Sequence, residues 1–186
     1  AIEKFSRIPV QVELSHEFRY RDPIVTERTL IVAVSQSGET MDTLMATRYA
    51  KEQGAKVLAI CNTQGATLAR ESDAVIYTHA GPEVAVASTK ALVAQITAGY
   101  LLALFLGAGR GATAQAELRR LGQELLKMPA NVTHVLERLE PIRELAKKMA
   151  DAKSVLFLGR NVGFPVAMEG ALKLKELAYI HAEGFA

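Results

Sequence analysis

The sequence has a single cysteine, Cys61, among its 186 residues. A lone cysteine cannot form an internal disulfide, which excludes a disulfide-stapled secreted domain and favours a reducing compartment such as the cytoplasm. Cys61 ends the apolar run 57–61, and no histidine is near it in the sequence. We therefore interpret it as a small buried hydrophobe, with a catalytic thiol as the lesser alternative.

An excess of charge of one sign is also lacking. The chain has 22 Lys and Arg residues against 20 Asp and Glu residues, a net charge of +2. Without a basic cluster there is no electrostatic footprint for nucleic acid, and we expect no nucleic-acid partner. A small anionic ligand is not excluded, because a phosphate needs local donors rather than net charge.

Motifs for metals and nucleotide cofactors are missing as well. The four histidines, at positions 16, 79, 134 and 181, do not have the spacing of metal ligands. Neither a G-x-G-x-x-G motif nor a Walker loop is present, so we expect no metal and no cofactor. His181 follows a predicted helix, where it either caps that helix or lines a site.

One long apolar run, 91–109, is close to the roughly 20 residues that a membrane span needs. It contains Gln95 and Thr97, and we favour a buried helix in a soluble domain or an oligomer interface over a membrane span. The opening residues do not have the pattern of a signal peptide, and we expect none. Ala1 begins in what reads as the middle of a helix and Ala186 is no natural ending, so we expect truncation at both ends.

Strands and helices are predicted to alternate in the first part of the chain. β-Branched apolar runs predict strands, helical periodicity predicts helices, and Gly54 is a suitable helix end. The predicted strands are 10–13, 29–35, 56–61 and 74–78, and the helices are 43–53, 67–71 and 88–106. Strands that are apolar on both faces predict an α/β fold with a covered parallel sheet, which binds ligands beyond the carboxyl ends of its strands.

The glycine-rich stretch 107–111 is interpreted as a break in the chain. Helices are predicted at 115–128, from about 132, and at 141–150, where Pro141 suits a first helical position. A strand at 154–159 and a helix at 165–180 then repeat the earlier strand–loop–helix order. The predicted organisation is a first domain at 1–112, linker helices at 113–150 and the start of a second domain at 151–186.

A hydroxyl-rich loop, Ser35–Thr40 (SQSGET), follows one buried strand and opens a helix. Hydroxyls and N–H groups at a helix N-terminus favour an anion, and Gly38 lets the backbone approach it closely. Ser35, Ser37 and Thr40 can each donate a hydrogen bond to a phosphate. Ordinary helix capping by Ser37 or Thr40 is the alternative.

A second candidate, Val86–Lys90 (VASTK), again places hydroxyls where a helix starts. From these residues alone, ligand binding and simple capping by Ser88 or Thr89 are equally good interpretations.

A third candidate lies on the predicted helix 165–180, where Glu169, Lys173 and Glu176 are spaced i, i+4, i+7 on one face. A solvated ladder of ion pairs is the ordinary interpretation. Gly170 and Ala171 indicate close packing beside the triplet, however. A carboxylate beside a lysine in a partly dry site suits proton transfer between adjacent carbons of a sugar.

Together these segments resemble the sugar isomerase (SIS) domain family and, within it, the isomerase region of glutamine–fructose-6-phosphate aminotransferases. The loop SQSGET is shared widely among SIS domains, whereas VASTKA and the stretch ending in YIHAE are more specific to the aminotransferases. The matching stretches are 15–21 (SHEFRYR), 35–40 (SQSGET), 58–62 (LAICN), 69–73 (ARESD), 86–91 (VASTKA) and 169–183 (EGALKLKELAYIHAE).

The resemblance implies a role for each candidate residue. The sugar phosphate would be bound by Ser35, Gln36, Ser37 and Thr40. The sugar hydroxyls would contact Ser88 and the backbone near Val86 and Ala87. Glu176 would move a proton between C1 and C2 of the sugar, with Glu169 and Lys173 positioning and tuning it.

The resemblance also implies a three-layer SIS fold that lacks its first strand, and the start of a second SIS domain. It implies a glutamine amidotransferase domain in the full-length chain, conversion of fructose 6-phosphate and glutamine to glucosamine 6-phosphate, and a homodimer. This chain alone is expected to be inactive and marginally stable. Two alternatives stay open: a non-catalytic module that senses sugar phosphates, and a different SIS deglycase or isomerase.

Overall fold

The computed structural model describes residues 1–85 and 87–186, so the predicted site residue Val86 lies outside the described residues. Within the described part, the chain divides into two compact units, Ala1–Leu126 and Lys127–Ala186, and each is described by itself. The organisation into residues 1–112, 113–150 and 151–186 stays a prediction.

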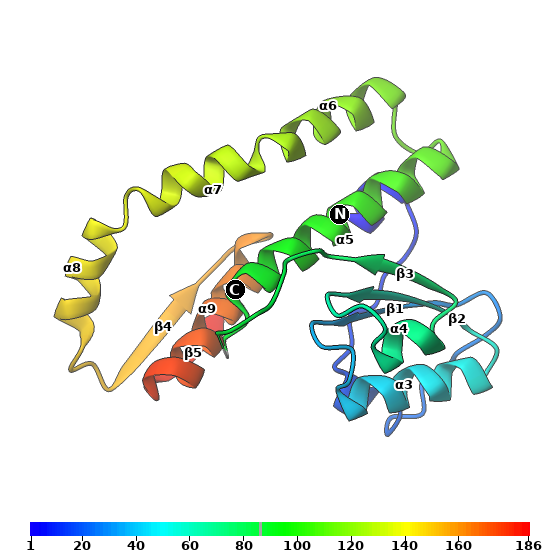
Figure 1. The fold of residues 1–186 in the computed structure, drawn as a ribbon, viewed down its shortest axis with the longest axis horizontal. Helices are drawn as coiled ribbons and strands as arrows, with labels where there is room; N and C mark the ends of the chain where they lie inside the picture. The colour runs from blue at the N-terminus through cyan, green and yellow to red at the C-terminus, as the bar shows by residue number, and fades with distance from the viewer. Residues whose placement is uncertain (86) are drawn as a thin grey trace. The chain divides into compact units, whose positions relative to one another are not determined.

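The first unit is built on a parallel sheet of three strands in the order β1-β2-β3. The strands are β1 (Leu30–Ser35), β2 (Lys56–Cys61) and β3 (Ala74–Tyr77). Two helices, α3 (Met41–Glu52) and α4 (Thr67–Glu71), pack against one face, as Figure 1 shows, and α5 (Thr89–Arg110) also packs against β2. The predicted parallel, helix-covered α/β fold is confirmed.

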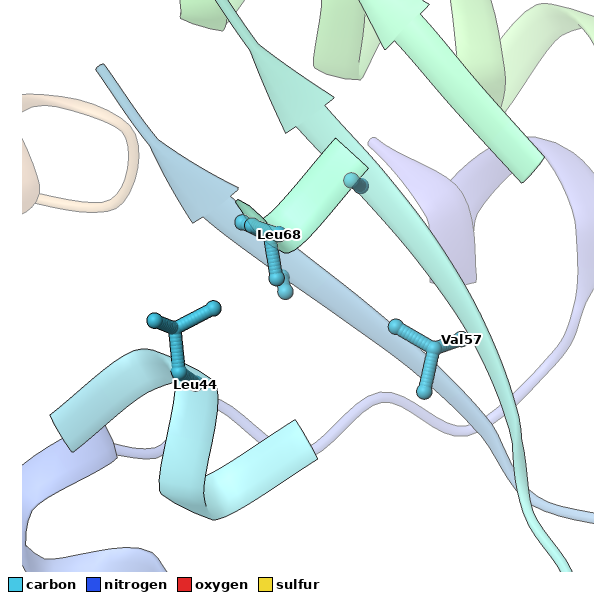
Figure 2. Close-up of a cluster of buried hydrophobic side chains, with 5 residues drawn as sticks. Leu44, Val57 and Leu68 are labelled. Carbon is cyan, nitrogen blue, oxygen red and sulfur yellow. The ribbon is translucent and has the colours of Figure 1, made fainter. Parts of the chain in front are cut away.

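Burial explains why these strands are apolar throughout. On one face, Leu44 of α3 and Leu68 of α4 pack with Val57 and neighbouring alanines of the sheet (Figure 2). Successive side chains of a strand point to opposite faces of the sheet. Leu58 and Ile60, which alternate with Val57 and therefore face the other side, are also buried. Burying one such side chain contributes about 1.5–3 kcal/mol, so the centre of β2 anchors the unit.

The predicted break at 107–111 occurs only at the last residue of that stretch, because α5 continues through Arg110 and Gly111 is its C-cap. Gly107 is buried against the short helix α1 (Ile2–Ser6), where an added Cβ would lie 2.9 Å from the carbonyl oxygen of Phe5. The glycine therefore permits two helices to approach closely. A further helix, α6 (Gln115–Leu126), follows α5.

The predicted strand at 10–13 is also wrong, because residues 7–14 form neither helix nor strand. The N–H of Val10 donates to the Glu3 carboxylate at 2.9 Å instead of to a neighbouring strand, and Val12 is 91% exposed. A strand needs a partner for its hydrogen bonds, and β-branched composition cannot supply one. A short helix that was not predicted, α2 (Ser15–Phe18), follows.

The second unit contains α7 (Met128–Leu136), α8 (Glu140–Met149), β4 (Ser154–Leu158), α9 (Gly163–Ala178) and β5 (His181–Phe185). Helix α7 begins about four residues earlier than predicted, with Pro129 in its first turn. Strands β4 and β5 are parallel, with Ser154 opposite His181, and α9 crosses over between them. Strand β5 was not predicted.

Helix α5 is long and apolar enough to cross a membrane by length and composition. In its most apolar 18-residue stretch, 28% is buried inside the structure. It packs against α1, α6 and β2, so part of its apolar surface belongs to the fold of the first unit.

Candidate functional site

The hydroxyl-rich loop lies where the sequence predicts it, between the end of β1 and the start of α3. Ser35 is the last residue of β1 and pairs in register with Cys61 of β2. Thr40 precedes the first residue of α3 as its N-cap. Since all three strands are parallel, the loop stands at the carboxyl edge of the sheet, where such folds bind ligands.

Gly38 gives the loop its tight path. Its φ is +71°, in the left-handed region that favours glycine. A Cβ at this position would lie 2.6 Å from the Cβ of Ala66 and 2.8 Å from the Sγ of Cys61. Its carbonyl oxygen accepts the N–H of Leu68 at 3.0 Å. No side chain fits here without moving the residues beneath the loop.

The loop hydroxyls are not used to cap α3. The Oγ of Ser35 accepts the N–H of Gly38 at 3.1 Å, and the Oγ of Ser37 accepts the N–H of Glu39 at 3.2 Å. Each of these serines keeps its own O–H proton to donate. Thr40 is the N-cap residue, yet no side chain caps α3, and Thr40 is exposed. The capping alternative therefore does not describe this loop.

Glu39 anchors the loop from the outside, a role that the sequence did not indicate. Its Oε1 accepts the N–H of Thr67 at 2.8 Å, at the start of α4. This hydrogen bond from the backbone of Thr67 is the main cause that lowers the pKa of the Glu39 carboxyl. The carboxylate therefore serves α4 rather than the hydroxyl side of the loop.

Cys61 is buried directly beneath the loop, as predicted for a small hydrophobe. Its Sγ lies 3.8 Å from the carbonyl oxygen of Gln36, to which the thiol can donate a weak hydrogen bond, and 3.6 Å from that of Thr63. Burial raises the pKa of the thiol, which disfavours the reactive thiolate. Cys61 thus supports the backbone of the predicted ligand Gln36 without nucleophilic chemistry of its own.

The second candidate segment is described from Ala87 onward. Ala87 is buried, and Ser88 is the N-cap residue of α5 in the left-handed conformation, with φ of 58°. Its side chain makes no capping hydrogen bond. Instead the carboxylate of Glu83 accepts the N–H of Ala91 at 3.1 Å. The hydroxyl of Ser88 is therefore also not committed to capping.

The third candidate, in the second unit, forms the predicted ladder on α9. The Nζ of Lys173 lies 2.6 Å from Glu176 Oε2 and 3.5 Å from Glu169 Oε1. Its hydrogen bond to Glu176 is the main cause that raises the pKa of Lys173, so the ammonium is the stable form at neutral pH. The Glu176 side chain is 40% exposed, which leaves its carboxylate accessible to a ligand.

Close packing beside the ladder is confirmed. A Cβ at Gly170 would lie 2.9 Å from two ring carbons of Phe157 on β4, and Ala171 is buried. The adjacent side of α9 therefore packs against the strand, which fixes the direction in which the ladder faces.

His181 does not cap α9, whose C-cap is Tyr179. It opens β5, and its Nε2 lies 3.4 Å from Glu183 Oε1. Among residues 1–85 and 87–186, no three His, Cys, Asp or Glu side chains are grouped so that they could hold a metal ion.

Comparison with known proteins adds a family to this geometry. A family model described as the SIS domain matches residues 1–105. Glutamine–fructose-6-phosphate aminotransferase (isomerizing) of Corynebacterium efficiens is 66% identical over 186 residues, which is 100% of this chain and 30% of that relative. The enzyme of the same name from Mycobacterium tuberculosis is 61% identical over the same length and coverage. The chain thus spans about a third of these relatives.

Solved structures agree with the fold. The C-terminal domain of glucosamine-fructose-6-phosphate aminotransferase from Francisella tularensis has a TM-score of 0.96 at 39% identity, over 99% of this chain and 52% of that one. Glucosamine-6-phosphate deaminase from Thermotoga maritima has a TM-score of 0.72 at 20% identity, over 100% of this chain and 54% of that one. At that identity the second likeness concerns the fold alone.

Proposed function

The chain belongs to the SIS domain family, and on that premise we propose that it is part of the isomerase region of a glutamine–fructose-6-phosphate aminotransferase. Such an enzyme makes glucosamine 6-phosphate from fructose 6-phosphate and glutamine. The observation that carries the proposal is the loop Ser35–Thr40, whose hydroxyls stand at a helix N-terminus and do not cap it.

The proposed phosphate site consists of Ser35, Gln36, Ser37 and Thr40. Hydroxyls that already accept a backbone N–H can turn their own protons towards phosphate oxygens. The positive end of the α3 dipole adds to the attraction. Ser88, with the backbone at Val86 and Ala87, would then contact hydroxyls of the sugar.

Glu176 is the proposed base. Ammonia derived from glutamine first replaces the C2 carbonyl oxygen of the ketose, which leaves as water, and gives an imine. The carboxylate then takes a proton from C1, the C1–H electron pair forms a C1–C2 double bond, and the imine π electrons take up a proton at nitrogen. Finally the C1–C2 π electrons take the proton back from Glu176 at C2, and the C1 hydroxyl releases its proton to solvent as C1 becomes the aldehyde, which balances the proton gained at nitrogen. Lys173 and Glu169 position the carboxylate, which the 2.6 Å contact from Lys173 to Glu176 supports.

The wider setting is proposed from the family as well. A glutamine amidotransferase domain would supply ammonia in the full-length protein, which we expect to be cytoplasmic and a homodimer. Large apolar side chains on α5, among them Ile96, Leu101 and Phe105, are half-exposed or more, which is consistent with self-association of a soluble protein.

The test uses two variants of the full-length protein. Ser37→Ala should weaken fructose 6-phosphate binding roughly 10- to 100-fold, because a hydrogen bond to a charged group is lost. Glu176→Gln should slow product formation by at least about 100-fold and leave the affinity for fructose 6-phosphate within about twofold. Turnover is measured as glucosamine 6-phosphate formed and affinity by calorimetry.

Matched controls separate these effects from general damage. Glu144→Gln removes one carboxylate from an exposed ladder on α8, where Lys147 lies 2.6 Å away, and should change neither quantity. Thr97→Val is the control for Ser37→Ala, because it removes a hydroxyl that donates only to the carbonyl oxygen of Val93 within α5, and it should likewise change neither quantity. Full turnover by Glu176→Gln would contradict a catalytic role and favour a module that only senses sugar phosphates.

A further inference from the structure

Asn62 stands at the centre of the sheet edge that carries the candidate phosphate loop. It follows β2 directly, and β2 is the middle strand between β1 and β3. Because β1 and β3 do not pair with each other, the end of β2 lies between the loops that follow them and can connect the two.

The contacts of Asn62 reach both of these loops. Its backbone N–H donates to the carbonyl oxygen of Gln36 at 3.1 Å, inside the loop after β1. Its side-chain Oδ1 accepts the hydroxyl of Thr78 at 2.9 Å and the N–H of Ala80 at 2.9 Å. Its Nδ2 donates to the carbonyl oxygen of Gly81 at 2.8 Å.

This pattern fixes the orientation of the amide. The oxygen faces two donors and the nitrogen faces an acceptor, so a flipped amide would place N–H groups against N–H and O–H groups. The half-buried side chain of Asn62 therefore binds the loop after β3 to the end of β2. The backbone N–H of the same residue binds the loop after β1.

We infer that Asn62 is a positioning residue that sets the spacing between the phosphate loop Ser35–Thr40 and the segment that leads to Ser88. The segment after Gly81 runs on to Ser88, the proposed contact of the sugar hydroxyls. A sugar phosphate that bridges the two segments would bind tightly only at the spacing that Asn62 holds. This inference rests on the proposed function of the two segments.

The test measures KM for fructose 6-phosphate, kcat, KM for glutamine and melting temperature in the full-length protein. Asn62→Ala should raise KM for fructose 6-phosphate about tenfold, with a smaller effect on kcat and none on KM for glutamine. Thr78→Val removes only the hydroxyl donated to Asn62 and should raise the same KM several-fold. Thr78→Ser keeps that hydroxyl and should behave like the unaltered protein.

The control lies at the other end of the same strand. Lys56→Met removes an ion pair to Asp73 of 3.0 Å and can lower the melting temperature, but it should not change KM for fructose 6-phosphate. The inference is overturned if Asn62→Ala lowers the melting temperature without raising that KM, or if Thr78→Val equals Thr78→Ser. Failure of the proposed function is distinguishable, because then Ser37→Ala would also leave KM unchanged.

Discussion

Two separate features favour glycine at position 38 of the candidate phosphate loop. Gly38 has a positive φ, and an added Cβ would crowd Ala66 and Cys61. Gly65 has nearly the same φ, +72°, but no atom within 4 Å of an added Cβ. The two glycines therefore separate backbone strain from crowding.

Gly38→Ala should lower both stability and sugar-phosphate affinity. Gly65→Ala should cost about 1–2 kcal/mol of unfolding free energy from the left-handed backbone alone. Gly38→Ala should cost about 1–3 kcal/mol more, because the buried residues below it must move. Calorimetric melting and fructose 6-phosphate titration of both variants check this. Equal losses would show that crowding under the loop is unimportant.

Glu39 predicts a pH dependence. The hydrogen bond from Thr67 lowers the folded-state pKa of this carboxyl, so its stabilisation is present above the unfolded value of about 4.3. It is lost as the pH falls through the lower folded-state pKa. Glu39→Gln should therefore lower the melting temperature at neutral pH, and the difference from the unaltered protein should vanish in acid.

The control for Glu39→Gln is Glu52→Gln, which makes the same substitution at the far end of α3. A melting difference for Glu39→Gln that stays constant from neutral pH down to about pH 3 would contradict a contribution from its charge.

At the scale of elements, α5 offers a comparison within one helix. An added Cβ at Gly107 would lie 2.9 Å from the carbonyl oxygen of Phe5 on α1, whereas one at Gly109 would meet no atom within 4 Å. Gly109→Ala should raise stability by up to about 1 kcal/mol through helix propensity. Gly107→Ala should lower it, because the two helices must separate. The melting temperatures of the two variants, compared with that of the unaltered protein, check this. A stabilised Gly107→Ala variant would contradict close packing of α1 on α5.

The sequence predicts an element well where local signals and burial agree. Residues 56–61 form a strand with the predicted bounds because an apolar run is also the buried centre of the sheet. Where the decisive contact is distant in sequence, prediction fails. In the sequence Gly107 indicates a helix end, and only its packing against Phe5 in the structure explains a glycine inside the helix. Strand β5 contains His181, Glu183 and Gly184, so its composition does not reveal its pairing with β4.

The candidate site shows the same limit. The hydroxyls of residues 35–40 and the ladder on α9 are visible in the sequence, since each lies within one short segment. The roles of Glu39 and Asn62 depend on partners in α4 and in the loop after β3. Nothing in their local sequence names those partners, so only coordinates reveal them.

At the scale of the whole molecule, the proposed roles divide between the two compact units. The proposed phosphate loop Ser35–Thr40 lies in the first unit, and the proposed base Glu176 lies in the second. If these proposed roles are right, neither unit alone would isomerise a sugar, because one would hold the phosphate and the other would move the proton.

The most direct measurement is a crystal structure of the full-length protein with fructose 6-phosphate bound. It should place phosphate oxygens about 2.6–3.2 Å from the hydroxyl oxygens of Ser37 and Thr40, with the Glu176 carboxylate within about 3.5 Å of C1 or C2. A phosphate bound away from this loop, or a Glu176 carboxylate more than about 6 Å from both carbons, would contradict the account.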